Sequence, residues 1–277
     1  MKRLLIRPGA IGDFIVSLPA MESLRADYTE VWCASAVVPL AGFADTARSI
    51  AAVGLDRVGL LPADDVIERL RGFDSIISWY GAKNNAFREF VRDLPFQFLP
   101  ALPSGRVHAV EFYNEQARHA GAVFPSRFPV IRCPEAFRSF AVIHPFASSM
   151  VKRAPMQAFE SAALKLSQTM PVHWLCGPEE TLDGAVRIDD LYELACWLAQ
   201  ARIFVGNDSG ISHLAAAVGT PAMTFFMAGS AARPYMWAPR GPAVHVILMS
   251  ADHAQLDEKP GHAATGRVPA PPNERGW

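Results

Sequence analysis

The segment "VGNDSGISHLAAAVGTP" (residues 205–221) has the pattern of one strand–turn–helix unit of a parallel α/β sheet. The apolar strand expected at 202–206 runs into Asn-Asp-Ser-Gly, and an alanine-rich helix follows at once. The first N–H groups of a helix have no partner within the helix and carry the positive end of its dipole, so a phosphate group fits there. Gly210 would let such a ligand approach the backbone closely. Asp208 or Ser209 can equally act as the helix cap, and capping and phosphate binding are compatible.

The same alternation of short apolar runs and helical patterns extends along most of the chain. It predicts βαβ units and mainly parallel sheets, and therefore an α/β fold. A helix is expected at about 38–53, in addition to helices between the other strands. The expected strands lie at 3–7, 30–35, 57–61, 75–81 and 96–100, and again at 140–146, 171–177, 202–206, 222–226 and 243–249.

A segment with three prolines and no clear period, residues 124–137, interrupts this alternation. Such a segment is typical of an interdomain linker. We therefore expect an N-terminal lobe over 1–130, a C-terminal lobe over 138–250 and a cleft between them. Residues 251–277 are polar and rich in Pro, Gly and Ala, and they predict a flexible tail.

The charge balance gives no reason to expect nucleic acid or an anionic membrane as the main partner. The formal net charge of the 277 residues is −1, and 51% of them are hydrophobic. The N-terminal apolar run is too short for a signal peptide, and no run is long enough for a membrane span. The sequence therefore predicts a cytoplasmic protein with at most peripheral membrane contact.

The four cysteines lie far apart and form no C-x-x-C pair: Cys33, Cys133, Cys176 and Cys196. This spacing argues against a zinc site and against a disulfide framework, and it suits a reducing compartment. Cys33 and Cys176 fall inside apolar strand-like runs, so we expect them to be small buried hydrophobic residues.

A second candidate for ligand binding is the segment "VIHPFASSMVKRAP" (142–155). A strand ends at His144-Pro145, and a loop of small residues leads to Lys152 and Arg153. In an open α/β lobe, ligands bind at the carboxyl ends of the strands. Lys152 could neutralise a leaving diphosphate there, or the pair could belong to a solvated basic loop.

The N-terminal segment "RPGAIGDFIVSLPAM" (7–21) is a third strand–turn–helix junction. Gly9 and Gly12 do not make up the G-x-G-x-x-G dinucleotide fingerprint. From the residues alone, Asp13 is expected to be an N-cap rather than a catalytic group.

Other polar residues have an ordinary structural interpretation beside a functional one. In "LCGPEE" (175–180), Glu179 or Glu180 could bind ribose hydroxyls, although an acidic helix start is the default. His213 is expected to be a satisfied structural histidine, and its spacing from Asp208 does not fit a zinc pair. Trp237 could line a sugar or base site or could close an edge of the core.

Taken together, these segments resemble the family 9 glycosyltransferases, which include the bacterial lipopolysaccharide heptosyltransferases. The resemblance runs in patches from residue 3 to about 248 and is most specific over 205–226. It implies a GT-B fold with two Rossmann-like lobes, the acceptor bound mainly by the first and the nucleotide-sugar by the second. It also implies inversion at the anomeric carbon without a metal ion or other cofactor.

The resemblance assigns the catalytic roles to two residues. Asp13 falls on the base that deprotonates the acceptor hydroxyl, and Lys152 on the basic residue that offsets the diphosphate charge. Gly9 and Gly12 belong to the acceptor side. The donor and phosphate side comprises Asp208, Ser209, Gly210, Ile211 and His213, the loop residues Ser148 and Ser149, and Glu179 or Glu180 as the ribose contact.

The chain departs from the family pattern at three positions. Ala154 stands in place of a tryptophan, Phe146 in place of a glycine and Ile211 in place of a proline. The leading hypothesis is a glycosyltransferase acting on a glycan or lipopolysaccharide-type acceptor at the inner face of the membrane, with ADP-heptose as a candidate donor. The alternatives are a catalytically degenerate nucleotide-sugar-binding protein on the same scaffold and, more distantly, an epimerase or hydrolase with GT-B lobes.

Overall fold

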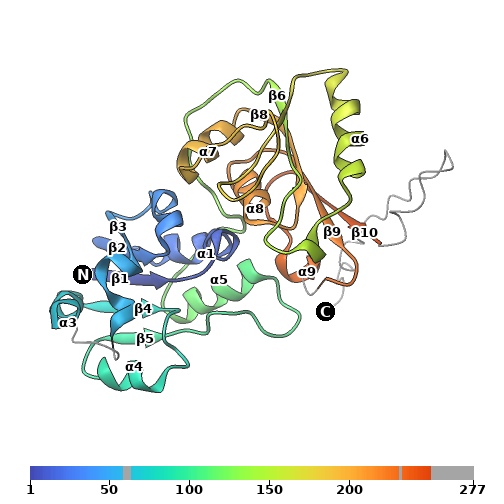
Figure 1. Ribbon diagram of the computed structural model, residues 1–277. Coiled ribbons are helices and arrows are strands. Elements are labelled where there is room, and N and C mark those ends of the chain that lie inside the picture. Colours follow the sequence, from blue (N-terminus) through green and yellow to red (C-terminus); the bar gives the residue numbers. More distant parts are fainter. Residues whose placement is uncertain (59–63, 231–232, 251–277) are drawn as a thin grey trace, which may run out of the picture.

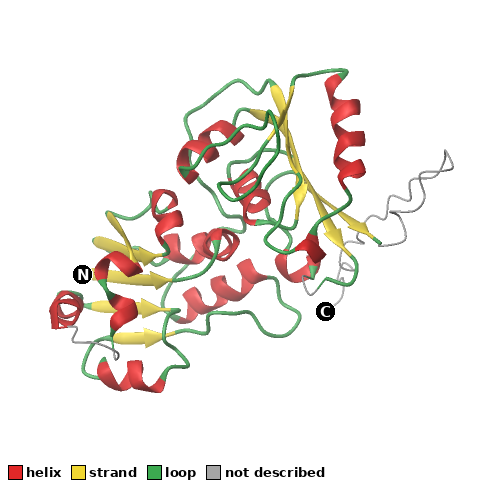
Figure 2. Ribbon diagram, in the orientation of Figure 1, coloured by secondary structure: helices red, strands yellow, loops and turns green. Residues whose placement is uncertain are grey.

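The computed structural model describes residues 1–58, 64–230 and 233–250 of the chain. Two α/β lobes are visible, each with a sheet of parallel strands flanked by helices (Figures 1 and 2). The predicted tail at 251–277, and most of the strand expected at 57–61, lie outside the described residues.

The first lobe contains a five-stranded parallel sheet in the order β3-β2-β1-β4-β5. Its middle strand β1 has three successive fully buried residues, Leu4, Leu5 and Ile6, as expected for a strand covered on both faces. The strands are β1 (Lys2–Arg7), β2 (Tyr28–Cys33), β3 (Thr46–Ser49), β4 (Ser75–Ser78) and β5 (Phe96–Phe98). The helices are α1 (Ile11–Ser23), α2 (Ile50–Val53), α3 (Asp64–Arg71), α4 (Asn85–Phe90) and α5 (Ala109–His119), with 3₁₀ turns at Ser35–Leu40 and Leu55–Arg57.

The helix expected at about 38–53 is wrong. This stretch contains the end of the 3₁₀ turn Ser35–Leu40, then strand β3 and the single helical turn α2. β3 pairs in parallel with β2, starting with Glu30 opposite Thr46. β3 is a four-residue edge strand without a fully buried residue, so its sequence shows no apolar alternation that would predict a strand. Its pairing with β2 decides its conformation.

The second lobe repeats the architecture, with strand order β10-β9-β8-β6-β7 and all neighbours parallel. The linker segment 124–137 that precedes it contains no helix or strand. The strands are β6 (Phe140–His144), β7 (Val172–Trp174), β8 (Ala201–Asn207), β9 (Ala222–Met227) and β10 (Val244–Met249). The helices are α6 (Met156–Ser167), α7 (Leu191–Leu198), α8 (Gly210–Ala217) and α9 (Pro234–Trp237), with a 3₁₀ turn at Met150–Lys152.

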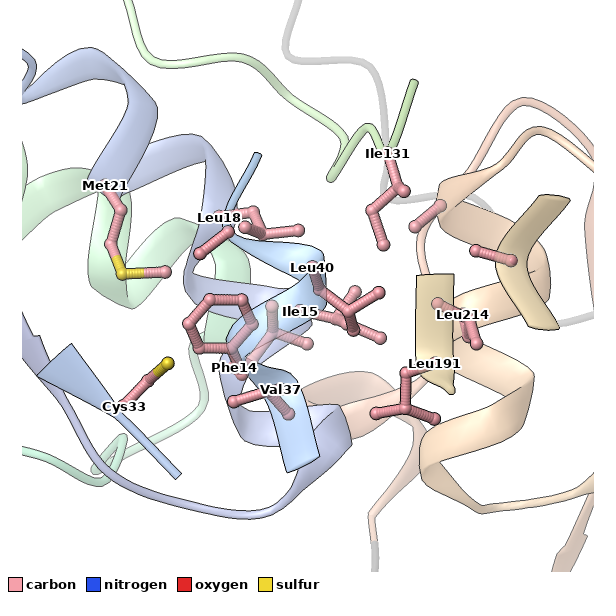
Figure 3. Packing of buried hydrophobic residues seen from close by; sticks show 14 of the residues in the cluster. Phe14, Ile15, Leu18, Met21, Cys33, Val37, Leu40, Ile131, Leu191 and Leu214 are labelled. Atoms are coloured by element: carbon pink, nitrogen blue, oxygen red, sulfur yellow. The ribbon is translucent and has the colours of Figure 1, made fainter. Parts of the chain in front are cut away.

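A single apolar cluster, the interlobe core, extends from the first lobe into the second. Figure 3 shows Phe14, Ile15 and Leu18 of α1 on one side and Leu191 of α7 and Leu214 of α8 on the other. The lobes are therefore joined by buried side chains as well as by the linker. None of the described helices has the length and apolar character needed to cross a membrane.

Candidate functional site

The turn between β1 and α1 places Asp13 in the first turn of the helix. Gly9 adopts a φ of +125°, a conformation that favours glycine. Ala10, not Asp13, occupies the N-cap position, and the Asp13 Oδ2 accepts a hydrogen bond from the Ala10 N–H at 3.2 Å. The expected N-cap is therefore wrong in position, although the Asp13 carboxylate does satisfy a free N–H at the helix start.

Arg7 lies beneath this turn and fixes its backbone. Its guanidinium donates to the carbonyl of Pro8 at 2.7 Å and to that of Asp13 at 2.9 Å. It also donates to the Ser17 Oγ at 3.0 Å and to the Tyr113 hydroxyl at 2.9 Å. Burial lowers the pKa of Arg7 and raises that of Tyr113 to about 12. Sequence reasoning missed Arg7, although a charged residue at the end of a buried strand was a visible signal.

The turn between β8 and α8 is capped by a hydroxyl. Ser209 is the N-cap residue, and its Oγ accepts from the Ser212 N–H at 3.4 Å. Of the two caps that the sequence allowed, Ser209 fills the role and Asp208 does not. Asp208 is buried, whereas Ser209, Gly210 and Ile211 are half-buried.

Asn207 joins the loops that follow β6 and β8. This fully buried side chain accepts a hydrogen bond from the Ala154 N–H at 2.9 Å and donates one to the Pro145 carbonyl at 2.8 Å. Because β6 and β8 are neighbours, both loops leave the same edge of the sheet. Sequence reasoning treated Asn207 as part of a loop and missed this function.

Lys152 and Asp208 are brought together by this arrangement. The Lys152 Nζ lies 2.8 Å from the Asp208 Oδ2, and their side chains are 30% and 7% exposed. The neighbouring Arg153 instead donates to the Ala147 carbonyl and lies over the Phe146 ring, 5.3 Å from its centroid. Of the basic pair, only Lys152 is thus placed beside the start of α8.

Ser148 and Ser149 belong to the same loop as Lys152. Ser149 is the N-cap residue of the 3₁₀ turn Met150–Lys152, and its carbonyl accepts from the Lys152 N–H at 3.1 Å. Ser148 is exposed and Ser149 is half-buried. Both remain candidates for contact with a donor.

The two glutamates after β7 differ in their surroundings. The Glu180 Oε2 accepts from the Gly177 N–H at 2.6 Å and lies 3.0 Å from the His144 Nε2. Burial alone would raise the pKa of Glu180, but the hydrogen bonds from His144 and Gly177 lower it. Glu180 therefore holds the turn itself, and Glu179 is exposed.

The starts of α1 and α8 touch each other across the lobe boundary (Figure 1). A Cβ on Gly12 would lie 3.2 Å from the His213 Cδ2, and a Cβ on Gly210 would lie 2.8 Å from the Ile11 Cβ. The sequence predicted that a ligand would approach the backbone at Gly210, but in this structure Ile11 occupies that space. Both glycines allow this close approach of the two lobes.

His213 is not the satisfied structural histidine that was expected. It is 5% exposed, and among the described residues its Nδ1 finds no hydrogen-bond partner. Burial, reinforced by the nearby His108 and Lys152, lowers the pKa of His213 to about 3. His213 is therefore neutral at physiological pH.

A second bridge between the lobes runs from α9 to α5. The His108 Nε2 lies 3.0 Å from the Ala238 carbonyl oxygen, and Arg240 donates to the Glu111 Oε1 at 2.7 Å. Burial lowers the pKa of His108 to about 4. Trp237 packs against the interlobe core, which agrees with its interpretation as an edge of that core.

The three departures from the family pattern have different surroundings. Ala154 is 6% exposed and packs in an apolar cluster of the second lobe that includes Phe159. Phe146 is half-buried beneath Arg153, and Ile211 packs against the interlobe core. Among the residues that the structure describes, no three His, Cys, Asp or Glu side chains are grouped to hold a metal ion.

Comparison with known proteins identifies the family. A sequence model described as "Glycosyltransferase family 9 (heptosyltransferase)" matches residues 108–260, which is more than half of the chain. The chain belongs to glycosyltransferase family 9. This family 9 chain is therefore a glycosyltransferase. A search of curated proteins finds no match.

Solved structures agree with this assignment in fold. The alignment with the Escherichia coli heptosyltransferase WaaC with ADP covers 90% of this chain and 93% of the WaaC chain, with 17% identity and a TM-score of 0.67. For E. coli ADP-heptose LPS heptosyltransferase II the coverages are 89% and 90%, the identity 17% and the TM-score 0.68. The alignment with the family 9 glycosyltransferase of Veillonella parvula DSM 2008 covers 92% of this chain and 87% of the other, with 15% identity and a TM-score of 0.66. The family 9 chain thus has the GT-B fold.

Proposed function

We propose that this glycosyltransferase moves a sugar from a nucleotide-diphospho-sugar to a hydroxyl group of a glycan or lipid-linked glycan, with inversion and without a metal ion. One observation carries the proposal: the first turns of α1 and α8 meet at the lobe boundary. The helix with Asp13 and the helix beside the Lys152–Asp208 pair therefore start at one place.

The second lobe would bind the leaving group. Ser209, Gly210 and Ile211 begin α8, where free N–H groups and the helix dipole favour phosphate oxygens. Because Ile11 covers Gly210 in this structure, the start of α1 would move away from α8 when the diphosphate binds. Lys152 would exchange its contact with Asp208 for one with the diphosphate. Its charge would then stabilise the negative charge that develops as the sugar–phosphate bond breaks.

The first lobe would supply the base. Asp13 would accept the proton of the acceptor hydroxyl while its oxygen forms a bond to the anomeric carbon. The diphosphate leaves from the opposite face of that carbon, so the configuration inverts. Arg7 supports this role because it holds the Asp13 carbonyl and thereby the start of α1.

Heptose is the sugar that the comparisons favour as donor. WaaC structures contain ADP or ADP-2-deoxy-2-fluoro heptose. We extend this to ADP-heptose as the donor of the present chain and to a lipopolysaccharide-type acceptor at the cytoplasmic face of the membrane. Phe146 and Ala154, which depart from the family pattern beside the Lys152 loop, are the positions where another donor would be accommodated.

Nucleotide binding and turnover test the proposal in turn. A thermal-shift screen with ADP, UDP, GDP, CMP and their sugars should give the largest rise in Tm with ADP-heptose, because a ligand of the native state stabilises it. ADP release should then require an acceptor, survive EDTA and give a product of inverted anomeric configuration by NMR.

Each other result points to a different function. Binding without turnover would mean a nucleotide-sugar-binding protein. Release of nucleotide without an acceptor would mean a hydrolase or epimerase. Loss of activity in EDTA that Mg²⁺ restores would refute the metal-independent mechanism.

A further inference from the structure

Two cysteines that are distant in sequence lie together where the linker crosses the second lobe. The Tyr192 hydroxyl on α7 donates to the Arg132 carbonyl at 3.1 Å. Cys196 stands one helical turn after Tyr192 and therefore on the same face of α7. Cys133 directly follows Arg132, and its thiol lies close enough to Cys196 for the second thiol to raise its pKa.

The surroundings of Cys133 admit a small anionic reagent. Cys133 and Cys196 are both only half-buried. A surface cavity of about 550 Å³ borders Cys133, and its lining includes Arg132 and Arg138. The two arginines outnumber the one acidic side chain there, Glu135, and favour a reagent that carries carboxylates.

We propose that Cys133 and Cys196 are a redox-modification site, at which exchange with a low-molecular-weight disulfide such as oxidised glutathione forms a reversible intramolecular disulfide. Transient disulfides of this kind occur in reducing compartments as redox responses. The site is independent of the proposed sugar transfer.

The exchange proceeds in two balanced steps. One of the two thiols loses its proton to solvent and attacks one sulfur of oxidised glutathione. The glutathione S–S bond breaks, a mixed disulfide forms, and the first glutathione leaves as a thiolate and takes up a proton. The other cysteine then loses its proton to solvent and its sulfur attacks the protein sulfur of the mixed disulfide. The second glutathione leaves as a thiolate and is protonated, so one S–S bond forms as one breaks. Two protein thiols are oxidised and one glutathione disulfide is reduced to two thiols.

The surroundings of Cys133 keep its thiol protonated in the reduced protein. Burial and the adjacent Cys196 raise the pKa of the Cys133 thiol to about 12. The other two cysteines are shielded, since Cys33 and Cys176 are 0% and 2% exposed. They provide internal controls for selectivity.

The disulfide would tie the linker to the second lobe. Ile131 of the linker and Leu191 of α7 already belong to the interlobe core. A cross-link beside them restricts the unfolded chain over the whole loop between residues 133 and 196. The oxidised protein should therefore melt higher than the reduced protein, by on the order of 5 °C.

The test equilibrates the full chain in glutathione buffers of increasing oxidised fraction, then quenches exchange with acid, alkylates the free thiols in denaturant and analyses the peptides by mass spectrometry. We expect two of the four cysteines to become protected, one cross-linked peptide containing Cys133 and Cys196, and full reversal by dithiothreitol. The C176S variant should behave in the same way. The C133S variant should stop at a Cys196–glutathione adduct.

Two results would overturn the proposal. One is four alkylatable thiols at every glutathione ratio, in a protein whose reduced Tm shows that it is folded. The other is a cross-link that involves Cys33 or Cys176, or that persists in C133S.

Discussion

The two strand-to-helix turns that meet at the lobe boundary use the same backbone unit and different side chains. In the first, a buried cation, Arg7, holds the turn from below, and the carboxylate of Asp13 closes the helix start. In the second, the neutral amide of Asn207 accepts a hydrogen bond from the backbone of the neighbouring loop, and the Ser209 hydroxyl caps the helix start. The α8 start therefore keeps no acidic side chain in its first turn, whereas α1 has one. In the proposed mechanism, one backbone unit thus supports the base in one lobe and the anion site in the other.

Of all the substitutions considered, replacement of Asp13 should lower the rate of sugar transfer most and so separate the roles of the two turns most clearly. Asp13→Asn keeps an oxygen for the Ala10 N–H but cannot accept the acceptor's proton, so the rate of transfer should fall about 10²–10⁴-fold. The rise in Tm on adding the donor should persist, because the donor side is untouched. Asp190→Asn, at the N-cap of α7, is the matched control and should keep full activity. Transfer at the unmodified rate in Asp13→Asn would refute the assignment of the base.

Replacement of Lys152 tests the opposite lobe. Lys152→Met removes the charge that we propose offsets the diphosphate, so kcat/KM should fall about 10²–10³-fold. In contrast to Asp13→Asn, the Tm rise with the donor should also shrink. Lys165→Met, in the exposed last turn of α6, should leave both measurements unchanged. An undiminished donor shift in Lys152→Met would place the diphosphate elsewhere.

Asn207 is expected to matter for stability. Asn207→Ala leaves the Ala154 N–H and the Pro145 carbonyl without their partner, which should lower the free energy of unfolding by about 2–4 kcal/mol. Urea unfolding measures this, with Asn85→Ala on the exposed surface of α4 as the control. A loss no larger than that of the control would show that the two loops are held by other contacts.

The pH dependence of stability tests the buried histidines of the lobe boundary. The pKa values of His213 and His108 are lowered to about 3 and 4 in the fold, from an ordinary value of 6.5. Below pH 6.5 the unfolded chain binds protons that the folded chain does not, so stability falls as the pH is lowered toward 4. Above pH 6.5 both states are neutral at these positions, and they contribute nothing.

The expected slope is about 1.4 kcal/mol per pH unit for each histidine. His213→Asn should remove one such contribution between pH 6 and 4.5 in urea titrations. His119→Gln, on an exposed side chain at the end of α5, should leave the slope as it is. An unchanged slope in His213→Asn would mean that His213 is already protonated in the fold.

The α/β architecture could be predicted because buried parallel strands have an unmistakable composition. Strand β1, with its continuous apolar run, shows this well. The polar edge strand β3 could not be recognised, since only its pairing with Glu30–Cys33 makes it a strand. The local sequence pattern thus predicts strands that are buried, and it fails for strands whose conformation depends on pairing with another strand.

The candidate site shows a similar division. Asp13, Lys152 and Ser209 stand in motifs and could be named in advance. Arg7 was visible only as a charged residue at the end of a buried strand, and Asn207 had no such signal. The importance of both lies in bonds to backbone groups of other segments, which the sequence does not reveal. The role of Gly210 also depends on a distant partner, Ile11, which no local pattern reveals.

The interlobe core also bears on how the molecule unfolds. Phe14 and Ile15 of α1 share one buried cluster with Leu191 and Leu214 of the second lobe. Unfolding either lobe alone would expose the apolar surface of the other to water, at a cost of about 25 cal/mol for each Å². The two lobes are consequently coupled thermodynamically, and heat should melt them as one cooperative unit rather than in two independent steps.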